Sequence, residues 1–312
     1  MSLRIVFMGT PEFAVPALAI LVDHGYDVVG VVTATDKWGG RGKKQLIESP
    51  VKKYATQQGI SVLQPRNLKD PDFQKALREL KANLQVVVAF RMLPEAVWSM
   101  PELGTFNLHG SLLPKYRGAA PINWAIIRGE KETGVTSFFL QHEIDTGDMI
   151  FQESMPIGEN DTAGDVHDRM MHLAAEVVLR TVRAIEAGRV HASKQDDRQA
   201  TPAPKIFRDT CRIRFDQPAT AVHNFVRGLS PYPAAWTTLD GLVIKILRTE
   251  KTHQPAGQAP GTLHSDDKTY LQVACADDYL NILEVQAQGR RRMAIRDFLN
   301  GFTLAETSGK MA

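Results

Sequence analysis

Asn107 and His109 are the residues whose types and spacing are best suited to chemistry in this sequence. They stand two positions apart at the end of the apolar stretch that begins at Gly104, and alternation along a strand puts both side chains on one face. An amide donor beside an imidazole can polarise a carbonyl group and move a proton. The pair also fits a simpler interpretation, in which Asn107 ends the strand and His109 is a hydrogen-bonded core histidine, and both interpretations stay open.

A carboxylate follows further along the chain, in the segment Asp145-Thr146-Gly147-Asp148 between two predicted strands. Asp, Thr and Gly are common turn residues, so an ordinary hairpin turn is the alternative. Together with the first pair, this segment supplies an amide, an imidazole and a carboxylate. A carboxylate near His109 would orient the ring and favour its imidazolium form.

Several familiar site motifs are absent from the sequence. There is no dinucleotide-binding G-x-G-x-x-G, the stretch Gly39–Lys44 lacks the Walker A spacing, and Ser111 is not in a G-x-S-x-G elbow. His167 and His172 do not form an H-E-x-x-H pattern, so no metal site is expected. These absences argue against NAD binding, nucleotide hydrolysis, serine hydrolysis and metalloproteolysis.

The elements that must position these residues form a predicted α/β domain over residues 1–189. The apolar run Leu3–Met8 predicts a strand, followed by Thr10 as N-cap and Pro11 as first helical residue of a helix running to about His24. Asp27–Thr33 predicts the next strand. Strand, helix and strand in this order indicate a parallel βαβ unit with a right-handed crossover.

The same alternation continues along the rest of this domain. Residues 34–49 are predicted to be a polar loop, whose length is unusual for a connection of this kind and suggests function. Ser49 is the expected N-cap of the next helix. Further strands are predicted at 61–63, 84–90, 104–109, 135–140 and 149–156, and further helices at 50–58, 71–80, 94–100, 121–128 and 163–187.

The pattern changes after residues 190–205, a polar stretch with prolines that we interpret as a linker. In residues 206–312, short predicted strands at 242–247, 270–274 and 280–285 alternate with turn residues, and one helix is expected near 219–228. This pattern predicts a second, smaller domain, a β-barrel or sandwich. The length of 312 residues fits two domains.

Composition and charge set wide limits on function. The net charge of +2 is too small to indicate a nucleic-acid partner by itself. Cys211 and Cys275 fit neither a metal site nor a disulfide framework, so a reducing cytoplasm is the expected location. No run is long enough for a membrane span, and the apolar run near the N-terminus is too short for a signal sequence.

The sequence resembles the folate-dependent formyltransferase family, and the resemblance covers nearly the whole chain. The family's central signature is matched by Asn107-x-His109-x-Ser111-Leu-Leu-Pro114, Arg117-Gly-Ala-Ala-Pro121 and Asp145-Thr-Gly-Asp148. Matches in the second domain, which narrow the resemblance to the branch acting on transfer RNA, include Val226-Arg227, Ile244-Lys-Ile246 and Gln286-x-x-Gly289-Arg290.

The resemblance implies a Rossmann-like N-terminal domain that binds 10-formyltetrahydrofolate, and a smaller C-terminal OB-like β-barrel that helps bind initiator methionyl-tRNA. It implies a catalytic trio of Asn107, His109 and Asp145. The implied folate-binding residues are Ser111, Leu112, Leu113, Pro114 and Arg91. The implied tRNA-binding residues are Arg41, Lys43 and Lys44.

Some positions depart from the family pattern. Phe90-Arg91 stands where Tyr-Gly is usual, Ala34-Thr35 replaces Gln-Pro, and Ala234 replaces a glycine. None of these positions touches the trio, so they bear on details of folate and tRNA contact. A solvated surface loop remains the alternative for the basic residues near Arg41.

The implied reaction is direct acyl transfer to an amine, with no covalent enzyme intermediate. Alternative functions are formyl transfer to an amino-sugar nucleotide or glycinamide ribonucleotide, hydrolysis of formylfolate, and RNA binding without catalysis. A pure RNA-binding protein has no need for the trio. We expect a monomer that needs no metal and no membrane.

Overall fold

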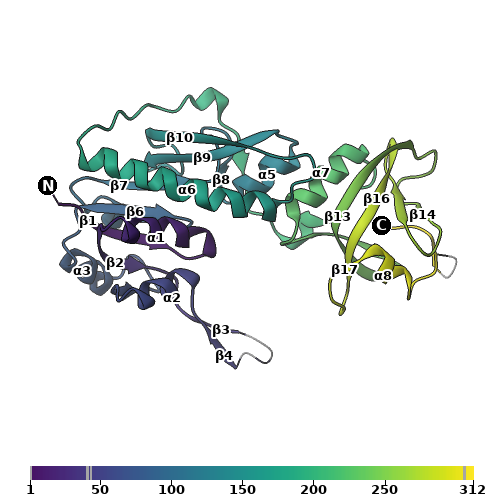
Figure 1. The fold of residues 1–312 in the computed structure, drawn as a ribbon, viewed down its shortest axis with the longest axis horizontal. Helices are drawn as coiled ribbons and strands as arrows, with labels where there is room; N and C mark the ends of the chain where they lie inside the picture. The colour runs from purple at the N-terminus through teal and green to yellow at the C-terminus, as the bar shows by residue number, and fades with distance from the viewer. Residues whose placement is uncertain (1, 40–41, 43, 305–306) are drawn as a thin grey trace. The chain divides into compact units, whose positions relative to one another are not determined.

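The computed structural model describes residues 2–39, 42, 44–304 and 307–312 (Figure 1). The chain divides into two compact units that interleave along the sequence. The first unit comprises residues 1–118, 134–155 and 167–202, and the second comprises 119–133, 156–166 and 203–312. Among the described residues, no helix has both the length and the apolar character needed to cross a membrane.

A seven-stranded sheet in the order β10-β9-β7-β6-β1-β2-β5 forms the centre of the first unit. Its strands are β1 (Arg4–Gly9), β2 (Asp27–Val32), β5 (Val62–Leu63), β6 (Leu84–Val88), β7 (Thr105–His109), β9 (Glu132–Phe139) and β10 (Met149–Pro156). The strands from β5 to β7 are parallel, and β9 runs antiparallel to β7. Buried parallel strands explain the continuous apolar runs in the sequence.

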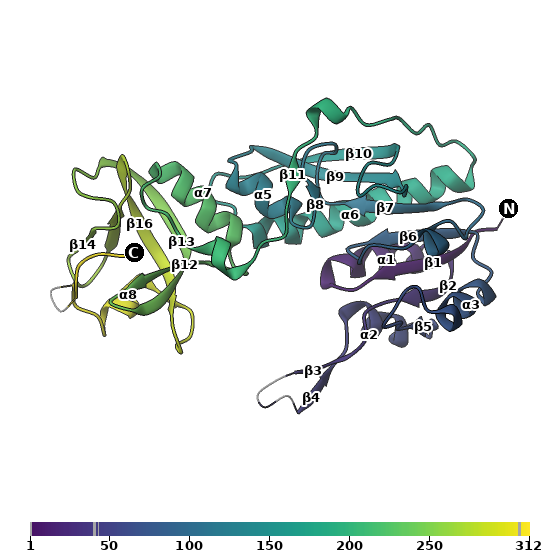
Figure 2. The ribbon, with the colours of Figure 1, turned by 180° about the vertical axis from the view of Figure 1, so that it is seen from behind.

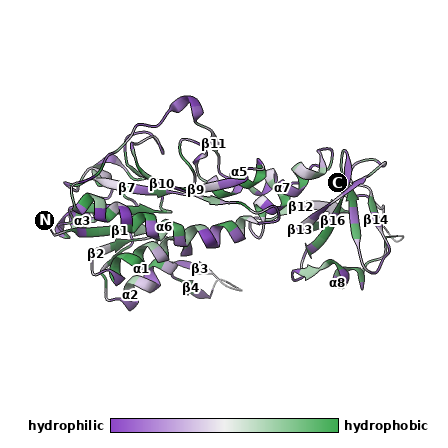
Figure 3. Ribbon diagram, turned by 45° about the horizontal axis from the view of Figure 1, so that its top comes forward, coloured by the Kyte–Doolittle hydropathy of each residue, from purple (hydrophilic) through white to green (hydrophobic). Residues whose placement is uncertain are grey.

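Helices cover both faces of this sheet, as the opposite views in Figures 1 and 2 show. Figure 3 shows apolar residues concentrated in the strands, while α6 alternates between polar and apolar residues along its length. The helices are α1 (Val15–Asp23), α2 (Pro50–Gln57), α3 (Pro71–Glu79), α4 (Glu95–Trp98) and α6 (Ala163–Glu186). The remaining short elements of this part of the chain are β8 (Arg117–Gly118), η2 (Asp197–Gln199) and β11 (Pro202–Ala203).

The register of the sheet shows which face carries the candidate residues. Asn107 pairs with Val87, which packs in one cluster with Phe73 of α3 and Val97 of α4. Cross-strand partners share a face, so Asn107 and His109 lie on the face that carries α3 and α4. The opposite face carries α6, where Thr181 bonds Ser137 at 2.9 Å.

The predicted start of the first helix was wrong. Pro11 has extended backbone angles (φ −77°, ψ 172°) and precedes a short 3-10 helix, η1 (Glu12–Ala14), so it is not a first α-helical residue. The α-helix begins only at Val15, followed by Pro16, whose missing N–H costs nothing in a first turn. The cap at Ser49 is confirmed, because its hydroxyl accepts a hydrogen bond from the Lys52 N–H at 3.1 Å.

The predicted loop over residues 34–49 contains two short strands, so that prediction was also wrong in part. β3 (Lys37–Gly39) and β4 (Gln45–Ile47) pair antiparallel, with Trp38 opposite Leu46. Three-residue strands are too short to show a clear alternation in sequence, and the polar residues around them resemble a loop.

The second unit is an antiparallel β domain, as predicted. Its sheet has the order β12-β13-β16-β15-β14, with β17 beside β16. The elements are α5 (Pro121–Ile127), η3 (Arg208–Cys211), α7 (Ala219–Leu229), β12 (Ala235–Leu239), β13 (Leu242–Pro255), β14 (Leu263–Ser265), β15 (Leu271–Ala274), β16 (Asp278–Ala287), β17 (Met293–Ala294) and α8 (Ile295–Leu299). Near the C-terminus, Met311 bridges Leu239 of β12 and Lys310 bridges Thr262, so one segment spans both edge strands and closes the sheet.

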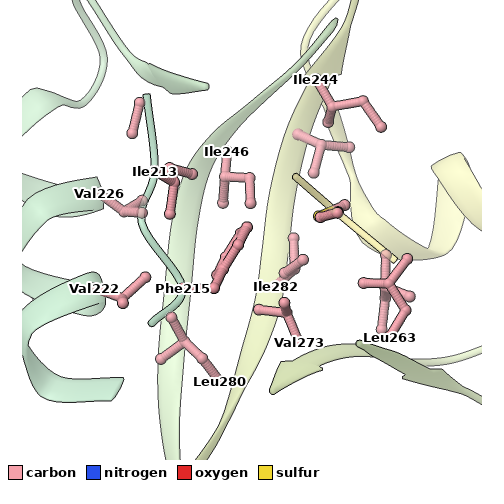
Figure 4. Packing of buried hydrophobic residues seen from close by; sticks show 14 of the residues in the cluster. Ile213, Phe215, Val222, Val226, Ile244, Ile246, Leu263, Val273, Leu280 and Ile282 are labelled. Atoms are coloured by element: carbon pink, nitrogen blue, oxygen red, sulfur yellow. The ribbon is translucent and has the colours of Figure 1, made fainter. Parts of the chain in front are cut away.

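Alternate residues of these strands form the core of the second unit. Ile244 and Ile246 of β13 and Ile282 of β16 are at most 1% exposed. Figure 4 shows them between the strands and helix α7, which contributes Val222 and Val226. Burial of alternate residues explains why the sequence pattern of this domain has a period of two.

Candidate active site

His109 and Asp145 face each other in the first unit. The Nδ1 atom of His109 lies 3.7 Å from Oδ2 of Asp145, and the two side chains are only 8% and 13% exposed. On the other side of the ring, Nε2 lies 2.8 Å from the carbonyl oxygen of Tyr116. A carbonyl only accepts, so Nε2 carries a proton and donates it, which leaves Nδ1 as the ring atom directed toward Asp145.

Asp145 is held in place by its own backbone and by the loop after β7. Its Oδ2 accepts a hydrogen bond from the Gly118 N–H at 2.9 Å. Its backbone has a positive φ of 56°, which aspartate tolerates better than most residues. A Cβ at Gly147 would lie 1.7 Å from the Phe139 carbonyl oxygen, so this close turn requires glycine there.

Asn107 presents an amide with no hydrogen-bond partner among the described residues. It is half-buried on β7. It lies near the carboxyl end of a strand in an open α/β sheet, the edge at which such sheets bind ligands. The predicted shared face is confirmed: β7 places Asn107 and His109 on one side, and His109 meets Asp145 there.

The segment from Ser111 to Pro114 is a tightly bonded turn. The Ser111 hydroxyl donates to the Lys115 carbonyl at 2.6 Å, and the Leu113 N–H donates to Thr136 Oγ1 at 3.1 Å. The Leu113–Pro114 peptide bond is cis. Ser111 and Leu113 are buried, whereas Leu112 and Pro114 are partly exposed, so the latter two side chains are the ones open to a ligand.

Arg91 lies on the exposed loop after β6. Its guanidinium donates to the Arg66 carbonyl at 2.9 Å and to the Pro65 carbonyl at 2.5 Å. It makes no hydrogen bond or ion pair with the trio in the described part of the chain. The structure therefore places His109 beside Asp145, with Asn107 on the same strand face as His109, and places Arg91 at the loop around residues 65–66.

Of the predicted tRNA-binding residues, Arg41 and Lys43 lie outside the described residues. Lys44 is exposed just before β4. The two strands of this hairpin also expose Trp38, Leu46 and Ile47, which are 67%, 47% and 51% accessible. An apolar surface of this kind on a small hairpin indicates a contact surface for a partner.

An ion pair anchors the base of the hairpin. Lys52 Nζ lies 2.5 Å from Asp36 Oδ2, and both side chains are less than one-fifth exposed. Hydrogen bonds lower the pKa of Asp36, and the bond from Lys52 has a larger effect than the bond from Gln64. The bond to Asp36 in turn raises the pKa of Lys52. Both groups therefore stay charged at neutral pH.

The sequence analysis missed the groups that hold the trio. The Tyr116 carbonyl and the Gly118 N–H are backbone groups, which carry no signal in residue type. Gln195 was placed in the linker, yet its side chain bonds the Asp145 turn. A single glutamine in a polar stretch offers no pattern that would have found it.

The fold and site belong to a known class of protein: the chain is a member of the formyl transferase family. Residues 3–182 match the formyl transferase model, and residues 205–303 match that of the formyl transferase C-terminal domain. The chain is 53% identical over 314 residues to the methionyl-tRNA formyltransferase of Bacteroides fragilis, covering 98% of this chain and 97% of the relative. The family expected from the sequence is thereby confirmed.

Solved structures share the fold at low sequence identity. The N-formyltransferase from Helicobacter canadensis, in complex with folinic acid and dTDP-3-aminofucose, has a TM-score of 0.70 at 20% identity, covering 93% of this chain and all of that one. The methionyl-tRNA formyltransferase from Clostridium thermocellum has a TM-score of 0.56 at 14% identity, covering 82% and 95%.

Proposed function

We propose that this protein transfers the formyl group of 10-formyltetrahydrofolate to the α-amino group of initiator methionyl-tRNA. The observation that carries this proposal is the 53% identity, along almost the whole chain, to a methionyl-tRNA formyltransferase. The product, formylmethionyl-tRNA, serves to start translation. The reaction would take place in the cytoplasm, where free Cys211 and Cys275 stay reduced.

The trio supplies what this reaction needs. The neutral amine nitrogen attacks the formyl carbon, a new C–N bond forms, and negative charge develops on the formyl oxygen. The free amide of Asn107 can donate a hydrogen bond to that oxygen. Because the Tyr116 carbonyl occupies Nε2 of His109, the second donor must be Nδ1–H of the same ring.

Asp145 completes the proton balance. Its carboxylate faces Nδ1 of His109 and accepts, through a water molecule, the proton that leaves the attacking amine. The C–N10 bond then breaks, and N10 of the folate takes up the proton that Asp145 received, which returns the carboxylate to its charged form. Because the amine attacks the formyl carbon directly, no covalent enzyme intermediate is required.

The folate would lie along the turn that follows β7. Leu112 and Pro114 offer partly exposed side chains, while the buried Ser111 and Leu113 fix the shape of the turn. Arg91 would meet the acidic tail of the folate from its exposed loop. The folinic acid in the Helicobacter canadensis enzyme supports a folate co-substrate for this fold.

Transfer RNA would be held by the β3–β4 hairpin and by the second unit. Trp38 is exposed on the hairpin, and the sequence that joins its two strands carries the cations Arg41, Lys43 and Lys44. Aromatic stacking and phosphate contacts are the usual means of holding single-stranded RNA ends. If Lys44 contacts a phosphate, Lys44→Ala will raise the KM for tRNA and flatten its salt dependence, because fewer counterions are released.

A transfer assay with labelled 10-formyltetrahydrofolate tests the proposed function. The acceptors are initiator methionyl-tRNA, an amino-sugar nucleotide, glycinamide ribonucleotide and water alone. We expect label only in formylmethionyl-tRNA. Label in another amine, or release as formate, would overturn the choice of acceptor, and no transfer at all would overturn the reaction. Size-exclusion chromatography with light scattering tests the expected monomer.

A further inference from the structure

We propose that Gln195 is a positioning residue for the reaction, which sets the place of Asp145 relative to His109. This inference rests on the proposed function, since it concerns the rate of formyl transfer. Gln195 touches none of the reacting atoms, so it acts only through the groups that it binds.

Four hydrogen bonds fix the Gln195 side chain. Its Nε2 donates to the carbonyl oxygens of Asp145 at 2.8 Å and Gly147 at 2.9 Å. Its Oε1 accepts from Arg117 Nε at 3.1 Å and Nη2 at 2.8 Å. Both amide hydrogens and both lone pairs are used, which is the full capacity of a glutamine side chain.

These bonds join the two stretches of chain that define the site. One stretch is the turn that carries Asp145, whose backbone has a positive φ. The other is the loop after β7, in which Tyr116 accepts from His109 and Gly118 donates to Asp145. Gln195 therefore connects the loop that holds the His109 imidazole to the turn that carries the Asp145 carboxylate.

The backbone around Gln195 reinforces the same connection. Ser193 and Met149 form an antiparallel bridge next to the Asp145 turn, with N···O distances of 2.8 and 2.9 Å. Thr201 binds the other stretch, because its Oγ1 accepts from the Tyr116 N–H and its carbonyl accepts from the Arg117 N–H, both at 2.9 Å. Residues 193–201 thus brace both halves of the site, beyond connecting two domains.

Neither an acid nor an apolar side chain can replace this amide. A carboxylate at position 195 keeps the acceptor for Arg117 but has no donor for the Asp145 and Gly147 carbonyls. A methionine of similar length keeps neither. The Arg117–Asp197 pair at 2.7 Å offers little compensation, because Asp197 is 79% exposed and exposed pairs contribute little.

The test measures kcat and KM for formyl transfer to methionyl-tRNA in Gln195→Met and Gln195→Glu. Gln199→Met is the matched control, because Gln199 is an exposed residue of the same segment whose side chain, among the residues that the structure describes, bonds only Asp196. We expect kcat to fall roughly 10-fold to 100-fold in both variants, the cost of a small misplacement. KM for the folate should change by less than about twofold, and the control should match wild type.

A double-mutant cycle with Asp145→Asn separates positioning from a general structural role. If Gln195 acts through Asp145, Gln195→Met will lower the kcat of Asp145→Asn by less than about threefold. Equal losses in both backgrounds, or wild-type kcat in both Gln195 variants, would overturn the inference. If the wild-type protein is active and the Gln195 variants are unaffected, only this inference is contradicted. If the wild-type protein itself is inactive, the proposed function is contradicted. Circular dichroism of each variant identifies misfolding, and Gln195→Glu provides the second test if Gln195→Met does not fold.

Discussion

Oδ2 of Asp145 lies 3.7 Å from Nδ1 of His109 and at the same time accepts a hydrogen bond from the Gly118 N–H. The distance to Nδ1 is longer than a hydrogen bond, so in this structure no hydrogen bond joins the carboxylate to the ring. Contacts of this kind often shorten when substrate binds. The backbone bond from Gly118 keeps the carboxylate oriented until then.

Removing the charge of Asp145 should therefore slow the reaction without loosening the turn. Asp145→Asn keeps an oxygen for Gly118 but has no carboxylate to accept a proton. We expect kcat to fall roughly 100-fold or more, in the range of a lost acid–base group. Asp23→Asn, at an exposed position on α1, is the control and should keep wild-type kcat. A kcat near wild type in Asp145→Asn would contradict the assigned role.

The core of the second unit predicts a contrast between two adjacent residues of β16. Ile282 is 1% exposed within the cluster of Figure 4, and Leu283 is 40% exposed on the other face. Ile282→Ala should lower the free energy of unfolding by about 2–5 kcal/mol, the cost of a cavity. Leu283→Ala should cost about 1 kcal/mol or less. Urea unfolding of both variants measures the difference, and equal losses would contradict the placement of β16.

Buried Cys275 should make the protein less stable in alkaline solution. Burial, followed by the charges of Asp277 and Asp278, raises the pKa of this thiol from 9.0 to about 12. The unfolded thiol ionises near its ordinary value while the folded thiol keeps its proton. Because the folded protein keeps this proton to a higher pH than the unfolded chain does, the stability that the protonated thiol contributes is lost as the pH rises from about 9 to about 12.

Unfolding in urea at pH 8 and pH 10 measures this effect. The free energy of unfolding should fall with pH, by at most about 1.4 kcal/mol per unit from this one group. Cys275→Ala removes the titrating thiol and should show a smaller fall. The same pH dependence in both proteins would show that the thiol does not contribute.

Much of the site could be predicted from sequence, because residue type and strand alternation carry the signal. The period of two placed Asn107 and His109 on one face, and β7 has that arrangement. The turn residues marked the position of Asp145. The partner of the ring, the Tyr116 carbonyl, could not be predicted, since every residue has a carbonyl and only the folded loop brings this one near.

Other features depended on contacts between distant parts of the chain. Gln195 bonds a turn about fifty residues earlier, and no local pattern encodes that pairing. The first helix began later than predicted because Pro11 is extended and Pro16 suits the first turn equally well. Strands β3 and β4 are short and polar around their turn, so sequence alone predicted a loop there.

The central claim is that Asn107 and its neighbours stabilise the formyl oxygen during transfer to methionyl-tRNA. The most direct measurement is the single-turnover rate of formyl transfer, with saturating 10-formyltetrahydrofolate, in wild type, Asn107→Ala and the exposed control Asn160→Ala. We expect Asn107→Ala to lower the rate roughly 10²-fold to 10³-fold, the cost of one lost oxyanion donor, with unchanged thermal stability. The control should transfer at the wild-type rate. A wild-type rate in Asn107→Ala would contradict the account.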